Sequence, residues 1–284
     1  MRIANLNDRA VLVRESGFVD LAAASDGRFG PDPRSVLASL PALRAWLADA
    51  SPADTESISP DDLARSGRLG PVVTDPSQVF AVGLNYRTHA AEMGLTPPSQ
   101  PMIFTKFPSS LTGPASDFRV PSETTDWEAE LVVVLGARAR HLSVDAALDA
   151  VAGLCVGQDL SDRGLQMAGS PAQFSLGKSH EGFAPIGPWV TTLDDAGDPQ
   201  DLRIECRLNG VVRQDSSTSD MVFTVAEIVA YLSRVVELRP GDLIFTGSPP
   251  GVGQGQRPPV FLAPGDVLET TISGLGRLRN VATP

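Results

Sequence analysis

The sequence TTDWEAELVVVLG, residues 124–136, predicts a β-strand with two carboxylates at its start. Apolar and β-branched residues run from Leu131 to Leu135, and a glycine closes the segment. Successive strand side chains point to opposite faces, so Glu128 and Glu130 should project to the same side, where two like charges repel. A divalent cation between them would remove this repulsion. The alternative is that both glutamates lie on a solvated strand end, which is the commoner position for charged residues.

The composition argues against several classes of protein. Hydrophobic residues make up 42% and charged residues 20% of the 284-residue chain, as in ordinary globular proteins. The formal net charge of −11 argues against a nucleic-acid-binding surface, because such surfaces are basic. We see neither a signal peptide nor the roughly 20 apolar residues of a membrane helix. We therefore expect a cytoplasmic protein that binds neither nucleic acid nor membranes.

The two cysteines, Cys155 and Cys206, do not indicate a metal or redox site. They lie far apart, and neither belongs to a Cys-x-x-Cys or Cys/His pattern, so a structural zinc or a redox dithiol is not supported. We expect both to be buried free thiols in a reducing compartment.

The sequence pattern changes near residue 70. This predicts a small N-terminal α+β domain, residues 1–70, and a larger domain, residues 71–284. Three strand-like segments within residues 1–24 precede a helical pattern from Asp32 to Leu47, which Pro41 should kink or split into two helices. Residues 51–75 are rich in Ser, Pro, Asp and Gly and predict a connection. Nothing in the N-terminal domain is typical of a catalytic site.

The larger domain contains several short predicted helices among its strands. One should be capped by Thr88 and ended by Gly94, another should run from Val144 to Val151, and the clearest covers residues 222–236. On the first of these, His89 and Glu92 are three residues apart and can touch. A carboxylate beside an imidazole fixes its tautomer and raises its basicity, so the pair is a candidate general base, or else a surface ion pair of little energetic value.

Further polar residues follow the next apolar strand. Asp159 stands at the end of that strand, where it is either part of a site or only a helix N-cap. Arg163 and Gln166 would share a face if a helix continues, and Lys178 lies in a polar loop. Three carboxylates without a Cys or His ligand favour Mg²⁺ or Mn²⁺ over zinc. No phosphate-binding loop, dinucleotide fingerprint in its required setting or G-x-S-x-G elbow is present.

Taken together, these segments resemble the fumarylacetoacetate hydrolase family over about residues 75–280. Five ordered motifs carry the resemblance, at residues 83–92 (GLNYRTHAAE), 126–131 (DWEAEL), 158–163 (QDLSDR), 177–179 (GKS) and 246–253 (TGSPPGVG). The chain departs from the family pattern at Gln158, Asp162, Gly164 and Ser248. The extra negative charge of Asp162 beside Asp159 could change substrate choice or metal affinity.

The resemblance implies a mainly β (α+β) fold: a β-roll of stacked mixed sheets with few helices, plus the small N-terminal domain, assembled as a homodimer. It also implies a site, whose residues fall into three groups. Catalysis would fall to His89, Glu92 and Lys178, substrate binding to Tyr86, Arg163, Gln166, Thr246 and Gly247, and Mg²⁺ or Mn²⁺ binding to Glu128, Glu130 and Asp159.

The resemblance further implies hydrolysis of a C–C bond in a short β-diketo acid, of the acylpyruvate or 2,4-diketo-3-deoxy sugar acid type. The metal would act as a Lewis acid, His89 would activate water, and Lys178 would help to stabilise the enolate that remains. Members of the family also decarboxylate oxaloacetate-like acids or isomerise 2-hydroxyhepta-2,4-diene-1,7-dioate. A non-enzymatic protein that binds metal and 2-oxo acids is a further alternative, although a binder would not need the His89–Glu92 base.

Overall fold

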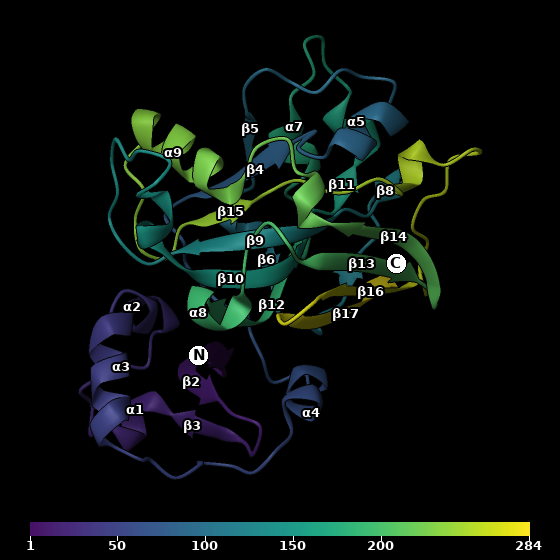
Figure 1. Ribbon diagram of the computed structural model, residues 1–284. Helices are drawn as coiled ribbons and strands as arrows, with labels where there is room; N and C mark the ends of the chain where they lie inside the picture. Colours follow the sequence, from purple (N-terminus) through teal and green to yellow (C-terminus); the bar gives the residue numbers. More distant parts are fainter.

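The computed structural model describes residues 1–284 and is built mainly from β-strands arranged in three sheets (Figure 1). The largest sheet has ten strands, in the order β3-β2-β1-β12-β10-β9-β15-β4-β5, with β6 paired to β12. Its strands are β1 (Arg2–Leu6), β2 (Arg9–Val13), β3 (Phe18–Asp20), β4 (Val79–Gly83), β5 (Met102–Thr105), β6 (Leu111–Thr112), β9 (Ala129–Leu135), β10 (Val151–Gln158), β12 (Ala184–Thr192) and β15 (Leu243–Phe245).

A second sheet of five strands, in the order β14-β13-β16-β17-β7, lies beside the large one (Figure 1). Its members are β7 (Phe118–Arg119), β13 (Arg203–Leu208), β14 (Val211–Ser217), β16 (Val267–Ile272) and β17 (Gly276–Thr283). The pair β8 (Thr125–Asp126) and β11 (Ser161–Asp162) forms a third, small sheet. Parallel and antiparallel pairs both occur, which confirms the expected mixed sheets.

The helices are few and short. They are α1 (Leu21–Ala24), α2 (Pro33–Leu37), α3 (Leu40–Asp49), α4 (Pro60–Arg65), α5 (Arg87–Glu92), α6 (Arg163–Gln166), α7 (Phe174–Gly177), α8 (Leu193–Ala196) and α9 (Val225–Val235), with 3₁₀ turns at residues 108–110, 147–150, 218–220 and 253–255. Only α9 has a complete capping box, formed by Thr224 and Glu227. None of the helices has both the length and the apolar character to span a membrane.

Strand β9 explains why the opening stretch reads as an unbroken apolar run. Leu131 and Val133 pack into a core of 35 buried residues on one face of the sheet, whereas Val132 and Val134 pack into a core of 23 residues on the other. A strand covered on both faces has no polar side to alternate with. The strand therefore lies inside the molecule, between β10 and β15, and its polar head is carried inside with it.

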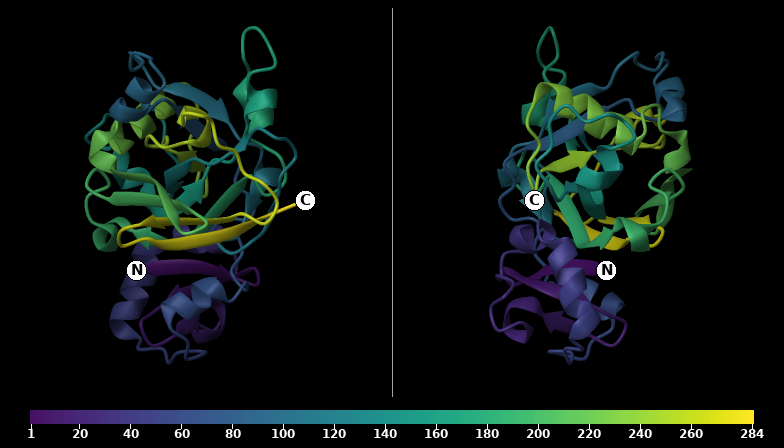
Figure 2. Two further views of the ribbon diagram at one scale, coloured as in Figure 1. Left: turned by 90° about the vertical axis from the view of Figure 1, so that its right-hand side faces the viewer. Right: turned by 60° about the vertical axis from the view of Figure 1, so that its left-hand side comes forward.

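The N-terminal residues form a separate lobe in the views of Figures 1 and 2, yet they extend the large sheet. Strand β1 pairs with β12 through Arg2 opposite Thr191 and Ile3 opposite Val190. An ion pair between Arg44 of α3 and Asp194 of α8 lies beside this junction. The domain boundary near residue 70 stays a prediction.

The helix predictions are confirmed in part, and two of them are wrong. The helical pattern of residues 32–47 is split into α2 and α3 near Pro41. Thr88 does not cap α5: Tyr86 occupies the N-cap position, and the Thr88 N–H donates to Asp220. The expected helix from Val144 to Val151 is only a 3₁₀ turn over residues 147–150, because Val151 already begins β10.

Candidate metal centre

Three carboxylates meet at the junction of β9 and β10. Glu128, Glu130 and Asp159 are all buried, and each offers an oxygen that lies within 4.8 Å of the others. The sheet register explains the meeting, because Glu130 lies opposite Gly157 and the Asp159 N–H donates to the Glu128 carbonyl at 2.9 Å. The start of β9 and the end of β10 are thus neighbours. The structure brings together all three residues predicted as metal ligands.

Two buried lysines neutralise part of this negative charge. Lys178 Nζ lies 2.7 Å from both Glu128 Oε2 and Asp159 Oδ2, and Lys106 Nζ lies 2.6 Å from Asp159 Oδ1. Burial lowers the pKa of Lys178, but Asp159 and Glu128 outweigh it and raise that pKa overall. For Lys106 burial prevails, and its pKa is lowered despite the contact with Asp159.

Glu130 has no cationic partner. Its side chain accepts one hydrogen bond, from the Gly247 N–H at 2.7 Å. Burial, followed by the charges of Asp159 and Glu128, raises the pKa of Glu130 well above its usual range. For Glu128, burial acts in the same direction, but Lys178 and Arg163 prevail and hold its pKa below its usual range. The cluster is therefore short of positive charge on the Glu130 side.

This charge deficit and the donor set fit a divalent cation. Three carboxylate oxygens are the hard ligands that Mg²⁺ and Mn²⁺ prefer, and no cysteine or histidine is among them. A cation beside Glu130 would compensate the one carboxylate that the lysines do not reach. Glu128, Glu130 and Asp159 are the residues that would hold it.

The predicted pair His89 and Glu92 forms on α5. His89 Nδ1 lies 2.9 Å from Glu92 Oε2, and Glu92 Oε1 accepts from the Gly251 N–H at 2.9 Å. A Cβ on Gly255 would lie 2.7 Å from Glu92 Cδ, so only glycine leaves room for this carboxylate. Both oxygens of Glu92 are thus fixed, which orients the imidazole. His89 Nε2 makes no hydrogen bond within the protein.

Arg163 and Gln166 share the short helix α6, as their spacing predicts. Arg163 binds Asp126 through Nε at 2.9 Å and contacts Glu128 through a terminal nitrogen at 2.7 Å. Its other terminal nitrogen donates to Gln166 Oε1 at 3.0 Å. Asp126 also accepts from the N–H groups of Gly253 and Gln254, so it joins this helix to the 246–256 loop.

Asp159 is not a helix N-cap: Asp162 caps α6 by accepting from the Leu165 N–H. Asp162 also accepts from Ser122 and lies 3.4 Å from His180, so its charge has local partners away from the carboxylate cluster. Burial raises its pKa, but these bonds prevail and lower it overall. Asp162, at which the chain departs from the family pattern, thus caps α6 and binds Ser122.

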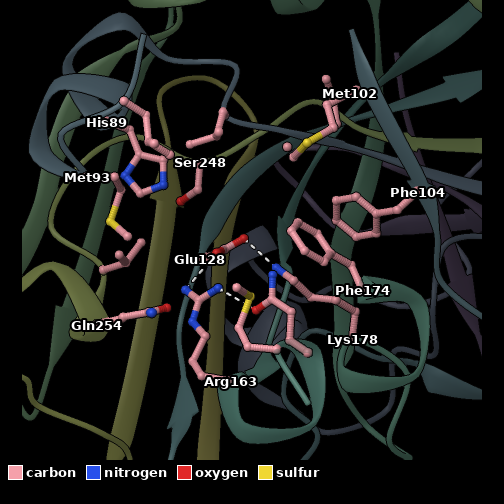
Figure 3. Close-up of a pocket in the computed structure, with 17 residues that line it drawn as sticks. His89, Met93, Met102, Phe104, Glu128, Arg163, Phe174, Lys178, Ser248 and Gln254 are labelled. Carbon is pink, nitrogen blue, oxygen red and sulfur yellow. Dashed lines mark hydrogen bonds and ion pairs between the residues drawn. The ribbon is translucent and has the colours of Figure 1, made fainter. Parts of the chain in front are cut away.

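A cavity of about 170 Å³ lies over the carboxylate cluster (Figure 3). Five of the predicted site residues line this cavity, together with nine hydrophobic residues. The lining consists of Val82, Gly83, Leu84, His89, Met93, Leu95, Met102, Phe104, Glu128, Arg163, Gln166, Met167, Phe174, Lys178, Ser248, Val252 and Gln254. In Figure 3, His89 faces the cavity from the side opposite Lys178, with Glu128 between them.

Three predicted substrate-binding residues do not line this cavity. Tyr86 is fully buried and its hydroxyl has no hydrogen-bond partner; burial, then Glu130, raises its pKa well above its usual range. The Thr246 hydroxyl donates to the Leu131 carbonyl at 2.9 Å, and the Gly247 N–H is taken by Glu130. In this structure all three contact protein, and their role in binding substrate stays a prediction.

Two charged residues of the site escaped the sequence analysis. Lys106 directly follows β5 as a single lysine after an apolar stretch, and Asp126 precedes the paired glutamates. Both are buried. The signal that could have identified Lys106 is its position as a lone lysine at the end of a strand-like segment. If such a segment is buried, its lysine needs a charged partner, because lysine is almost never buried without one.

Comparisons with known proteins identify relatives of this chain. Over 210 residues the chain is 42% identical to the mitochondrial oxaloacetate tautomerase fahd2 of Xenopus laevis, which covers 73% of this chain and 66% of that relative. It is 44% identical over 215 residues to a 2,4-didehydro-3-deoxy-L-rhamnonate hydrolase of Sphingomonas sp., which covers 75% of each chain.

A solved structure shares the whole fold. Maleylpyruvate hydrolase from Sphingobium sp. SYK-6, in complex with manganese(II) and pyruvate, is 27% identical, with a TM-score of 0.78 over 100% of this chain and 99% of that one. The family model described as fumarylacetoacetate (FAA) hydrolase C-terminal matches residues 78–283. This chain therefore belongs to the fumarylacetoacetate hydrolase family.

Proposed function

We propose that this protein is a divalent-metal-dependent hydrolase that cleaves a C–C bond in a short 2,4-dioxo acid of the acylpyruvate type. The observation that carries the proposal is that His89, held by Glu92, and Glu128 of the carboxylate cluster line one cavity. A metal-binding protein without turnover would need the cluster but not the base. Two relatives with hydrolase names, one of them solved with manganese(II) and pyruvate, support the same class of reaction.

The chain's own residues supply most of the chemistry. Because Glu92 holds Nδ1, His89 Nε2 is the atom that takes a proton from water. The water oxygen bonds to C4 of the substrate, the C3–C4 bond breaks, and C3 receives a proton. The products are a carboxylic acid and a 2-oxo acid. A metal held by Glu128, Glu130 and Asp159 would supply Lewis-acid polarisation of the substrate oxygens.

Lys178 and Arg163 complete the site. Lys178 faces the cavity beside Glu128, where its charge stabilises negative charge on a substrate oxygen. Arg163 donates to Asp126 and Gln166, and its second terminal nitrogen lies 2.7 Å from both Asp126 and Glu128. It lines the cavity, where its remaining N–H groups can reach the substrate carboxylate. Gln166 lines the cavity next to it.

A panel assay tests this function. The purified protein is incubated with acylpyruvates and, in parallel, oxaloacetate, with Mg²⁺, with Mn²⁺ or with EDTA. We expect metal-dependent loss of the dioxo-acid absorbance with stoichiometric release of pyruvate. Turnover of oxaloacetate alone would instead favour tautomerisation or decarboxylation, the first of which is the activity named for the Xenopus relative. Binding without any turnover would favour the non-enzymatic alternative.

We also infer a homodimer, which the family resemblance implies. The sequence pattern further suggests a cytoplasmic location and a division into domains at residue 70. Sedimentation analysis of the purified chain tests the homodimer.

A further inference from the structure

Much of the cavity lining outside the carboxylate cluster is apolar. Nine of its seventeen lining residues are hydrophobic. The apolar wall consists of Met93, Leu95, Met102, Phe104, Met167 and Phe174, and Figure 3 shows Met102, Phe104 and Phe174 together beside Lys178. The rings of Phe104 and Phe174 meet edge to face, with centroids 5.6 Å apart. This wall offers burial to an apolar group.

The cations of the cavity are paired with carboxylates of the protein. Arg163 and Lys178 are the only arginine and lysine in the lining, and both contact Glu128. Lys178 also binds Asp159, and Arg163 also binds Asp126. A second substrate carboxylate, at the end away from the cluster, would therefore enter an apolar wall without a counter-ion. Burying a charge without a partner is costly.

Hydroxyl groups would find few partners at the same wall. The polar uncharged lining residues are Gln166, Ser248 and Gln254. Of these, Gln166 accepts from Arg163, and the Ser248 oxygen accepts from Gln214 Nε2 at 2.8 Å. A polyhydroxylated chain needs several donors and acceptors to replace its water. The six apolar residues supply none.

We propose that the cavity selects 2,4-dioxo acids with an uncharged, apolar distal chain, in preference to diacids and polyhydroxylated sugar acids. The proposal rests on the function proposed above and specifies its substrate class. The single carboxylate lies at the cluster end, and the distal chain packs against the six-residue wall. Three of the chain's five methionines are in that wall, and their flexible side chains accommodate distal chains of different length.

Binding of 2-oxo acids tests this selection without requiring turnover. Calorimetric titration of the Mg²⁺-loaded protein compares 2-oxohexanoate with 2-oxoadipate, which differ in whether the last carbon is a methyl or a carboxylate. We expect 2-oxohexanoate to bind roughly 10- to 100-fold more tightly. From 2-oxobutanoate to 2-oxohexanoate, each added methylene should tighten binding by up to about fourfold. Equal or tighter binding of 2-oxoadipate overturns the proposal.

A charge placed in the wall should reverse the preference. Met102→Arg introduces a cation into the apolar wall. We therefore expect the affinity for 2-oxoadipate, relative to that for 2-oxohexanoate, to rise by at least about tenfold. Leu176→Arg adds the same charge at an exposed residue outside the cavity and should leave the preference unchanged. Met93→Arg repeats the test from the other side of the cavity if Met102→Arg does not fold. An unchanged preference in a folded wall variant overturns the proposal.

Turnover separates this inference from the proposed function. With 2,4-dioxooctanoate and 2,4-dioxooctanedioate as substrates, we expect kcat/KM to favour the monoacid by a similar factor. Hydrolysis that favours the diacid overturns the selectivity and leaves the hydrolase function standing. An alkyl preference in binding, with no hydrolysis of either compound, supports the selectivity and refutes the hydrolase function.

Discussion

Lys106 Nζ lies 2.6 Å from Asp159 Oδ1, and neither side chain is exposed to solvent. The same ammonium group donates to the Lys178 carbonyl, so one buried cation holds both a candidate metal ligand and the residue that bridges two of them. The charge of Lys106 lies behind the cluster, since the residue is absent from the cavity wall. Lys106 therefore contacts the carboxylate cluster from outside the cavity.

Replacing this lysine should destabilise the metal-free protein. In Lys106→Met, Asp159 keeps only Lys178 as a cationic partner, and breaking a buried pair typically costs about 3–5 kcal/mol. Mg²⁺ should recover part of that loss. Urea denaturation with and without Mg²⁺ measures both effects. As a control, Arg138→Met removes the exposed pair with Glu237 and should cost under about 1 kcal/mol. Equal stability of the two variants would contradict the structural role of Lys106.

Glu130→Gln should have opposite effects on stability and on metal binding. The change removes a buried carboxyl group whose ionised form has no cationic partner, and the amide oxygen can still accept from Gly247, so at pH 7 the metal-free protein should gain about 1–3 kcal/mol of unfolding free energy. Metal affinity should fall by more than the roughly 10- to 100-fold that loss of an outer-shell partner costs. Denaturation and Mn²⁺ titration measure the two quantities. A variant that binds Mn²⁺ normally would show that Glu130 is not a ligand.

His89→Ala should lower kcat without changing metal affinity. Loss of a general base typically costs about 10²–10⁴-fold, and the metal dissociation constant should not move because His89 is not among the carboxylate ligands. Glu92→Gln should cost about as much: its amide oxygen can accept from Gly251, but its amide nitrogen then donates to Nδ1 and leaves the ring proton on Nε2, the wrong tautomer for a base. Steady-state kinetics and Mn²⁺ titration distinguish these effects. Full activity of His89→Ala would refute the assignment of the base.

The contact between the N-terminal lobe and α8 should depend on pH. The hydrogen bond with Arg44 lowers the pKa of Asp194 below its unfolded value. Its contribution to stability is therefore present above that unfolded pKa, about 4, and is lost as pH falls through the folded pKa. Both side chains are nearly half exposed, so Asp194→Asn should cost at most about 1 kcal/mol at pH 7. Urea denaturation from pH 7 to pH 2 should show a constant difference down to about pH 5 and a decrease only below about pH 4.

Much of the site could be predicted from sequence because its residues follow regular elements. The i, i+2 spacing of Glu128 and Glu130, the strand end before Asp159 and the i, i+3 spacing of His89 and Glu92 each translate directly into geometry. The apolar run of β9 likewise predicted a strand.

The remaining features depend on contacts between distant segments. Lys106 belongs to no periodic pattern, and Asp126 shares the i, i+2 spacing of Glu128 and Glu130 but binds Arg163 instead. The partners of Lys106 and Asp126 lie 53 and 37 residues away. The segment ending at Val151 has helical spacing, but pairing with β9 draws that residue into the sheet. Tertiary contacts override local preference there, and the apolar wall of the cavity could not be assembled from spacing at all.

The pairing of β1 with β12 has a consequence for shortened forms of the protein. The family match begins at residue 78, so a chain trimmed to the matched part would lose β1 and leave part of the β12 backbone without a neighbour. Unpaired strand edges recruit other chains and promote aggregation. The N-terminal lobe, which holds none of the candidate site residues, thus shields the catalytic sheet, and solubility should suffer before activity if it is removed.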